Sequence, residues 1–188
     1  MFDQINGLPV HVLVLHAAVI FVPLLALGAL VYAVVPRWRS KIGWAVALLA
    51  VIAPLSTLVA KLSGTKLYNR LIDQGLSGRG KEILDDHMSF GTTTWWLSLA
   101  LGLVTLVMVG LTVRSRTPDR TMVNAGAGAG GSGGATLARE SAAETRTAGV
   151  PRIVEIVLAI AMVVLAALAG YYVFRTGDAG ATAVWGQY

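Results

Sequence analysis

The chain of 188 residues contains no cysteine and few charged residues. Without cysteine it can form no disulfide, no thiolate-held iron–sulfur cluster and no thioether-attached haem, and it has no thiol nucleophile. Charged residues make up 13% of the chain, whereas a typical soluble domain has about 25%. The mean hydropathy is +0.68. This composition favours a membrane protein over a soluble enzyme.

Four long apolar runs account for the high hydropathy. They cover about residues 9–35, 43–62, 88–113 and 153–174. Each run is long enough to cross the ~30 Å hydrocarbon core of a bilayer as a helix, which takes about 20 residues. The sequence therefore predicts an all-α integral membrane four-helix bundle that forms a single domain over residues 1–188, with no separate soluble domain.

The basic residues lie mainly in two of the three predicted loops. The first loop carries Arg37, Arg39 and Lys41, and the third carries arginines between Arg114 and Arg152, while the middle loop is mixed in charge. The positive-inside rule then places loops one and three in the cytoplasm and both termini outside it. The net charge of +5 reflects this topology and contact with anionic lipid headgroups, and we expect no nucleic-acid partner.

Two segments between the spans have distinct predicted structures. A short interfacial helix in the outer loop, ending at Gly75, is predicted from apolar side chains at helical spacing, namely Leu67, Tyr68, Leu71 and Ile72. Residues 120–148 include a run rich in glycine and alanine, which predicts a flexible cytoplasmic tether. We detect no internal repeat between the two halves of the sequence.

Small and polar residues mark the faces along which the helices should pack. In the third run they follow three- and four-residue steps, namely His87, Gly91, Thr94, Ser98, Gly102 and Thr105. Such a stripe is typical of a face turned toward neighbouring helices. In the second run Pro54 precedes Ser56 and Thr57, whose hydroxyls we expect to satisfy the backbone that the proline opens.

All three histidines lie near the predicted outer ends of the spans. Counting about 20 residues outward from the cytoplasmic ends puts His11 and His87 roughly 7–11 Å above the hydrocarbon core, at one common level. His16 lies deeper, and its five-residue offset from His11 turns it by about 140° around the helix. Asp178 follows the fourth span on the same side of the membrane.

These residues are the candidates for a ligand-binding site. Neutral imidazole binds zinc, copper, nickel and iron, so His11 and His87, with His16 as the alternate and Asp178 as a carboxylate ligand, could hold a transition-metal ion. Two histidines from different helices could instead hold a haem from opposite faces. A third possibility is structural, with the rings bonded only to carbonyls and water.

Three further charged residues have predicted supporting roles. Asp85 and Asp86 directly precede His87, and either carboxylate could orient its second ring nitrogen. Arg175 at the outer end of the fourth span could balance the charge of a ligand, although an end-of-helix arginine more often extends to the interface as a simple cation.

Both ends of the chain resemble motifs of a known family. The segment at 8–16 reads Leu-Pro-Val-His-Val-Leu-Val-Leu-His and resembles the pattern Pro-x-His-Pro-x-x-Val-His-Phe-Pro. The segment at 175–186 reads Arg-Thr-Gly-Asp-Ala-Gly-Ala-Thr-Ala-Val-Trp-Gly and resembles Arg-Thr-Gly-His-x-Gly-Ala-x-x-Val-Trp. With the Asp-Asp-His before the third span, the chain resembles the bacterial membrane-protein family catalogued as domain of unknown function 2231.

The resemblance implies a role in electron transfer at the bacterial plasma membrane. Members of the family resemble four-helix membrane cytochromes in outline and are sometimes joined to Rieske or cytochrome c domains. This implies respiratory or redox membrane proteins as partners, at the outer face of the lipid bilayer. The chain departs from the pattern at Asp178, where a histidine is expected, and at Val12, where a proline is expected. A haem that needed a histidine on the fourth helix is thereby excluded. A haem held by His11 or His16 with His87 remains compatible with the sequence, and an oxygen-tolerant metal site fits it best.

Two functions follow for this sequence. In the first, the protein holds haem b or a transition-metal ion at the outer ends of helices one, three and four, as an electron-transfer or metal-handling subunit. In the second, it is a non-catalytic accessory subunit of a larger membrane complex. We assign no catalytic residue, and the sequence favours a non-enzymatic role for the chain by itself over an enzymatic one. A transporter is disfavoured because the spans lack paired acidic residues.

Overall fold

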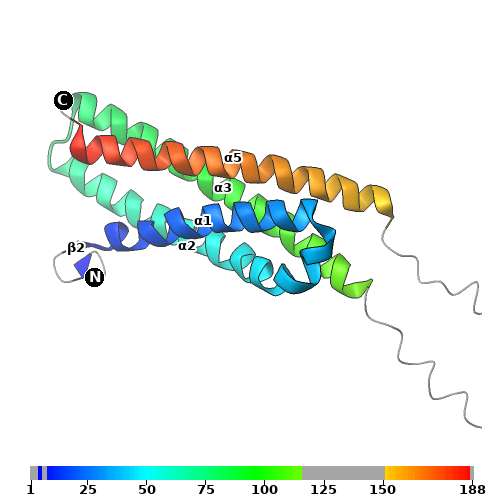
Figure 1. The fold of residues 1–188 in the computed structure, drawn as a ribbon. Helices are drawn as coiled ribbons and strands as arrows, with labels where there is room; N and C mark the ends of the chain where they lie inside the picture. Colours follow the sequence, from blue (N-terminus) through cyan, green and yellow to red (C-terminus); the bar gives the residue numbers. More distant parts are fainter. Residues whose placement is uncertain (1–3, 6–7, 116–150, 187–188) are drawn as a thin grey trace, which may run out of the picture.

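The computed structural model describes residues 4–5, 8–115 and 151–186, which form four long helices lying side by side (Figure 1). A short antiparallel pairing of β1 with β2 precedes the first helix, and the 3-10 turn η1 connects it to the second. The elements are β1 (Gln4–Ile5), β2 (Leu8–Pro9), α1 (Val10–Val34), η1 (Pro36–Trp38), α2 (Arg39–Asp73), α3 (Gly78–Arg114) and α5 (Arg152–Trp185). The predicted tether at 120–148 lies outside the described residues.

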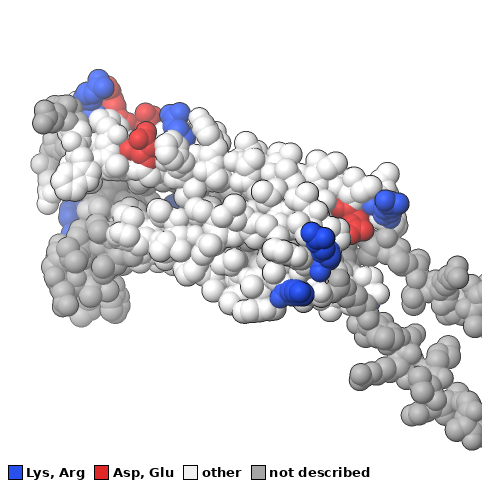
Figure 2. Space-filling model, viewed as in Figure 1, with Lys and Arg blue, Asp and Glu red and all other residues white. Residues whose placement is uncertain are grey.

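All four helices are long and apolar enough to cross a membrane. On the face shown in Figure 2, charged side chains gather at the two ends of the bundle and leave an uncharged band between them. The start of α1 and the end of α5 lie at the same end (Figure 1), which we call the terminal end; the opposite end, with η1, is the η1 end. The predicted four-span membrane bundle is therefore confirmed.

The helices form a ring in which each packs against two neighbours. Both α1 and α3 pack against α2 and α5, so α1 and α3 lie diagonally across the bundle. The interior between them is filled by apolar side chains, among them Val22, Leu25, Ala29, Tyr32, Leu101, Met108, Met162 and Ala169. A residue on the inner face of α1 can therefore meet one on α3 only across the centre of the bundle.

The segment predicted as a separate interfacial helix is instead the end of α2. This helix has 35 residues and is about 50 Å long at 1.5 Å per residue, well beyond the ~30 Å hydrocarbon core. No proline follows Pro54 before the end of α2, so nothing breaks the helix at the membrane surface. The prediction treated the end of the apolar run as the end of the helix, but helical hydrogen bonding continues past it.

The predicted stop at Gly75 is confirmed. Gly75 has a φ of +93°, which glycine adopts without steric cost. Its N–H donates to the carbonyl of Ile72 at 2.9 Å, and the N–H of Leu76 donates to that of Leu71 at 3.0 Å. This pair of bonds is a Schellman motif, which satisfies the last carbonyls of a helix.

The polar stripe of α3 faces the interior, as predicted. Thr94, Ser98 and Thr105 are buried. The Thr94 hydroxyl lies 2.9 Å from that of Thr176 on α5, and the Ser98 hydroxyl lies 3.0 Å from that of Thr57 on α2. These two hydroxyl pairs join α3 to both of its neighbours, and interhelical bonds of this kind stabilise membrane bundles.

The backbone opened by Pro54 is not satisfied in the predicted way. Proline has no N–H, so it cannot bond the carbonyl of Ala50 one turn earlier. Ser56 and Thr57 donate to the carbonyls of Ala53 and Pro54 instead. The Ala50 carbonyl faces Gly102 of α3, where a Cβ would lie only 2.5 Å from its oxygen. The absence of a side chain at Gly102 allows α3 to approach α2 this closely.

Candidate functional site

His11 lies in the first turn of α1 and bonds to the neighbouring helix α2. Its Nδ1 is 2.9 Å from the carbonyl oxygen of Ala60 and 3.2 Å from the hydroxyl of Ser63. The Ser63 hydroxyl donates to carbonyls of its own helix, so it accepts from the histidine. The ring also lies directly against Gly64, where a Cβ would be 3.0 Å from Cε1.

His87 lies in the third turn of α3 and makes the equivalent contacts with α5. Its Nδ1 is 2.9 Å from the carbonyl oxygen of Thr176. Its ring lies against Gly180, where a Cβ would be 3.0 Å from Cε1. Each histidine thus bonds to a helix other than its own, and the two rings draw on all four helices.

The two rings meet inside the terminal end of the bundle. Their centroids are 6.3 Å apart and their planes are nearly perpendicular, at 86°. This proximity agrees with the common level that the depth count predicted for His11 and His87. Because helices α1 and α3 are diagonal neighbours, the two rings approach each other across the centre of the bundle at this end.

The hydrogen bonds of the rings determine their tautomers. A carbonyl oxygen can only accept, so Nδ1 carries the proton in both His11 and His87. In the neutral ring the other nitrogen, Nε2, then keeps its lone pair. Metal-binding histidines in proteins are commonly held in this way, with the second nitrogen bonded to a carbonyl or carboxylate. The pair therefore offers two imidazole donors with fixed tautomers.

Burial also favours the neutral form of His11, which lies before the apolar window Val14–Val34. Withdrawal of the ring from water lowers its pKa below the ordinary value, and the nearby His87 ring acts in the same direction, while the bond to the Ala60 carbonyl opposes both. Since a protonated imidazole has no free lone pair, a lowered pKa keeps His11 available as a ligand at neutral pH.

Two other predicted ligands do not join this pair. The side chain of His16 is exposed, in keeping with its rotation around α1 away from His11. Asp178 is likewise exposed on α5. Among the residues that the structure describes, no group of three or more histidine, aspartate or glutamate side chains could hold a metal ion. A ligand at the pair would therefore have two protein donors from this part of the chain.

The structure gives the carboxylates before His87, which were predicted to orient its ring, other surroundings. Asp85 accepts from the Tyr68 hydroxyl at 2.5 Å and from Lys81 at 2.6 Å, and Asp86 is exposed. The Thr176 carbonyl takes the orienting role instead. Residues one and two positions before His87 on a helix point away from its side chain, because only residues three or four apart share a face.

Arg175 directly precedes Thr176, whose carbonyl accepts from His87. Its guanidinium carbon is 4.8 Å above the centre of the Phe90 ring, and Nη1 donates to the Tyr171 hydroxyl at 3.2 Å. Phe90 is three residues after His87, on α3. The predicted charge-balancing residue is therefore at the terminal end and is held by two aromatic side chains.

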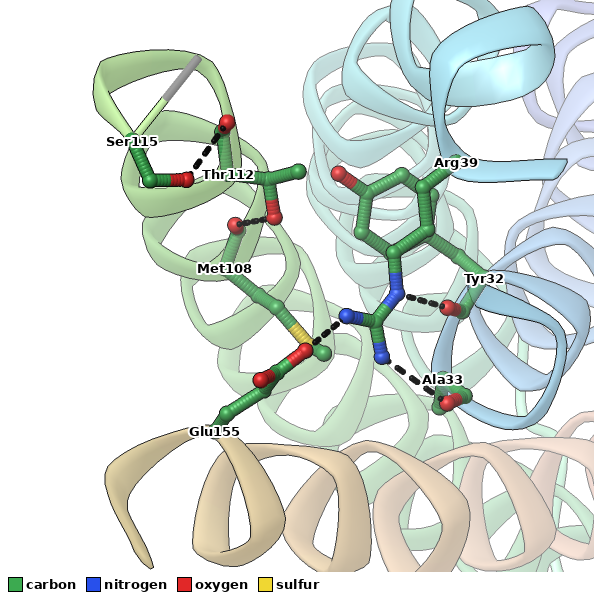
Figure 3. A network of polar contacts seen from close by, with 7 residues as sticks. All are labelled: Tyr32, Ala33, Arg39, Met108, Thr112, Ser115 and Glu155. Carbon is green, nitrogen blue, oxygen red and sulfur yellow. Dashed lines mark hydrogen bonds and ion pairs between the residues drawn. The ribbon is translucent and has the colours of Figure 1, made fainter. Parts of the chain in front are cut away.

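A second polar cluster, at the η1 end, was not predicted as a cluster from the sequence. Figure 3 shows Arg39 of α2 directed at the last turn of α1 and at Glu155 of α5. Nε donates to the carbonyl of Tyr32 at 2.9 Å, Nη2 to that of Ala33 at 3.1 Å, and Nη1 pairs with Glu155. Arg39 was read only as one basic residue of a cytoplasmic loop, and nothing in the local sequence distinguishes it from Arg37.

The residues that hold the two imidazoles were also missed by sequence reasoning. They lie far along the chain from the histidines that they contact, and they are Ala60, Ser63 and Gly64 on α2 and Thr176 and Gly180 on α5. The one signal was in the terminal motif at 175–186, which contains both α5 residues. No comparable sequence motif marks Ala60, Ser63 and Gly64 on α2.

Fold and site together define a multi-pass helical membrane protein with two imidazole donors at one end of its bundle. A family model described as "Predicted membrane protein (DUF2231)" matches residues 7–187. Because the match covers nearly the whole chain, the protein belongs to this family. Comparison with curated proteins and comparison with solved structures gave no significant match.

Proposed function

We propose that this protein is a membrane subunit that holds a redox cofactor between His11 and His87 and exchanges electrons with a partner at the terminal end. The observation that carries the proposal is the paired geometry of the rings. Two half-buried imidazoles have their centroids 6.3 Å apart, and each donates its Nδ1–H to a backbone carbonyl. With each Nδ1 proton held by a carbonyl, the lone pair of each neutral ring is on Nε2, the atom that would bind the ligand.

The donor set favours haem b over a bare metal ion. Two neutral imidazoles whose Nδ1 protons are held by carbonyls match the donors that a noncovalent haem takes from protein. A haem would be held by His11 and His87 alone, whereas a tetrahedral ion needs four ligands. The described residues form no group of three or more histidine, aspartate or glutamate side chains that could hold a metal ion, and the absence of cysteine leaves only noncovalent haem.

Other residues of this chain have defined roles in the proposed site. Ala60 and Thr176 fix the tautomers through their carbonyls. Arg175, whose guanidinium lies against Phe90 and bonds to Tyr171, would pair with a carboxylate of the ligand. The bound group would supply one-electron chemistry.

We place the terminal end outside the cytoplasm of a bacterial plasma membrane. Basic residues at the η1 end support this orientation through the positive-inside rule; those described are Arg37, Arg39, Lys41, Arg114 and Arg152. The helices α2, α3 and α5 are each longer than a bilayer core requires. A respiratory or other redox membrane protein would then reach the histidine pair from the outer side.

The optical spectrum of the purified full-length protein tests the proposal. Protein in detergent is loaded with haemin and measured oxidised and after reduction with dithionite. We expect a Soret band that shifts on reduction and is lost or altered in His11→Ala and His87→Ala. His16→Ala is the matched control, because it removes an exposed histidine of the same helix, and it should keep the spectrum.

Three results would contradict the haem assignment. A loss of the spectrum in His16→Ala equal to that in His87→Ala would mean that the haemin binds elsewhere. No Soret shift, together with one equivalent of a transition metal by elemental analysis, would favour a metal-handling subunit. Neither haemin nor metal binding, with a co-purifying membrane complex, would favour the accessory role.

One observation favours the accessory role as the second candidate. The apolar window of α5 is only 17% buried within the chain, and a Cβ at Gly170 or at Gly110 of α3 would meet no atom within 4 Å. These small-residue positions are open to lipid or to another membrane helix. By contrast, Gly102 is used inside the bundle, against α2.

A further inference from the structure

The two histidines are held by the same local arrangement, repeated in the two halves of the bundle. His11 donates to the carbonyl of Ala60, and the residue four positions later on that helix is Gly64. His87 donates to the carbonyl of Thr176, and the residue four positions later is Gly180. The sequence shows no repeat here, because the shared elements are one glycine and one backbone carbonyl in each half.

Helix geometry explains why the fourth residue is glycine. In a helix, Cα–Cβ bonds tilt toward the N-terminus, so the side chain of each residue covers the turn that precedes it. A side chain at position i+4 therefore covers the carbonyl of residue i. A glycine at that position leaves the carbonyl open to a donor that approaches from a neighbouring helix.

The contacts at both glycines are tight enough for a methyl group to disturb them. A Cβ at Gly64 would lie 3.0 Å from Cε1 and 3.2 Å from Nδ1 of His11. A Cβ at Gly180 would lie 3.0 Å from Cε1 and 3.1 Å from Nδ1 of His87. Both separations are shorter than an ordinary van der Waals contact of about 3.5–4.0 Å, so alanine at either position must displace the ring and lengthen its hydrogen bond.

We infer that Gly64 and Gly180 are positioning residues that hold His11 and His87 in the Nδ1–H tautomer and so leave both Nε2 atoms free to bind the ligand. Their relevance to a cofactor rests on the proposed function, but their effect on the tautomers does not. Each glycine acts on one ring, and neither would touch the ligand itself.

The structure offers controls on the same helices. A Cβ at Gly177, next to Thr176, would meet no atom within 4 Å. Gly177→Ala therefore replaces a glycine of α5 by alanine without a new contact with either histidine. Gly102→Ala disturbs the contact between α2 and α3 away from the pair. It reports what a loss of bundle packing alone does to the histidines.

Nuclear magnetic resonance of the full-length protein tests this inference without any cofactor. Isotopically labelled histidine nitrogens are measured in the ligand-free protein at neutral pH. We expect a protonated Nδ1 and an unprotonated Nε2 for His11 and His87. Gly64→Ala should change the tautomer of His11 and leave that of His87, Gly180→Ala should do the reverse, and Gly177→Ala and Gly102→Ala should change neither.

A second measurement connects the tautomers with ligand binding. Titration with haemin should give dissociation constants raised by about tenfold or more in Gly64→Ala and Gly180→Ala, the range typical for loss of an orienting contact. Gly177→Ala should remain within about twofold of the unchanged protein, because its added methyl group contacts nothing.

The outcomes separate the two proposals. Protonated Nε2 atoms in the unchanged protein, or tautomers unaffected by both glycine variants, would overturn the positioning role. Selective shifts of the tautomers in a protein that binds neither haemin nor metal would support the positioning role and refute the cofactor. If one glycine variant fails to fold, the other variant and the tautomers of the unchanged protein decide the question.

Discussion

In the polar cluster at the η1 end, we expect the loss of Arg39 to destabilise the protein much more than the loss of the Glu155 charge. Arg39→Met removes donors from two carbonyls at the end of α1 and from Glu155. The Tyr32 carbonyl has no other donor four residues later, because Pro36 lacks an N–H. Arg39 therefore serves as the C-terminal cap of α1 and as the link from this hairpin to α5.

The size of the effect follows from burial. The Arg39 side chain is 7% exposed, whereas that of Glu155 is 46% exposed. Two hydrogen bonds from a charged donor contribute about 1.5 kcal/mol each at the lower bound, so we expect Arg39→Met to lower the free energy of unfolding by about 3 kcal/mol. Glu155→Gln should cost about 1 kcal/mol or less, because water screens a half-exposed carboxylate.

Unfolding of the detergent-solubilised protein with SDS, followed by tryptophan fluorescence, measures these changes. Arg37→Met is the matched control, since Arg37 is an exposed basic residue of the adjoining turn, and it should be close to neutral. The free energy of unfolding of Arg39→Lys should lie between those of the unchanged protein and Arg39→Met, because a single ammonium cannot reach three acceptors as a guanidinium does. A cost for Glu155→Gln as large as that for Arg39→Met would refute the reasoning.

Two further predictions concern packing and the carboxylates near the site. Gly102→Ala should lower the free energy of unfolding by about 1–3 kcal/mol, as overpacking does, because its Cβ would lie 2.5 Å from the Ala50 carbonyl; Gly110→Ala, with no atom near, should be neutral in the same SDS titration. Asp85→Asn should leave the haemin dissociation constant unchanged, because Asp85 bonds to Tyr68 and Lys81 and not to His87. A tenfold weaker affinity in that variant would restore a role for the carboxylate.

The common level of His11 and His87 could be predicted because the bilayer has the same thickness for every helix that crosses it. The length of an apolar run sets where each span leaves the hydrocarbon core, so counting along two separate helices gives comparable heights. This counting could not find the end of α2, since leaving the hydrocarbon does not end a helix.

Closeness in sequence did not predict which groups contact the His87 ring, because it does not give the direction of a side chain. Asp85 and Asp86 adjoin His87 in sequence, but a helix turns about 100° per residue, so neighbours along the chain point in different directions. The orienting groups are backbone carbonyls, which every residue carries and which no sequence pattern marks. Gly64 and Gly180 mark them only after the neighbouring helices are known.

The sequence by itself determined that the chain crosses a membrane, how many times it does so, and which residues share a level within it. These properties depend on hydrophobicity and on distance along single helices. Only the tertiary structure decided that α1 and α3 lie diagonally, that His11 and His87 meet while His16 and Asp178 do not, and that Arg39 reaches Glu155. Those results depend on the rotation and pairing of helices, which are set by contacts between residues distant in the chain.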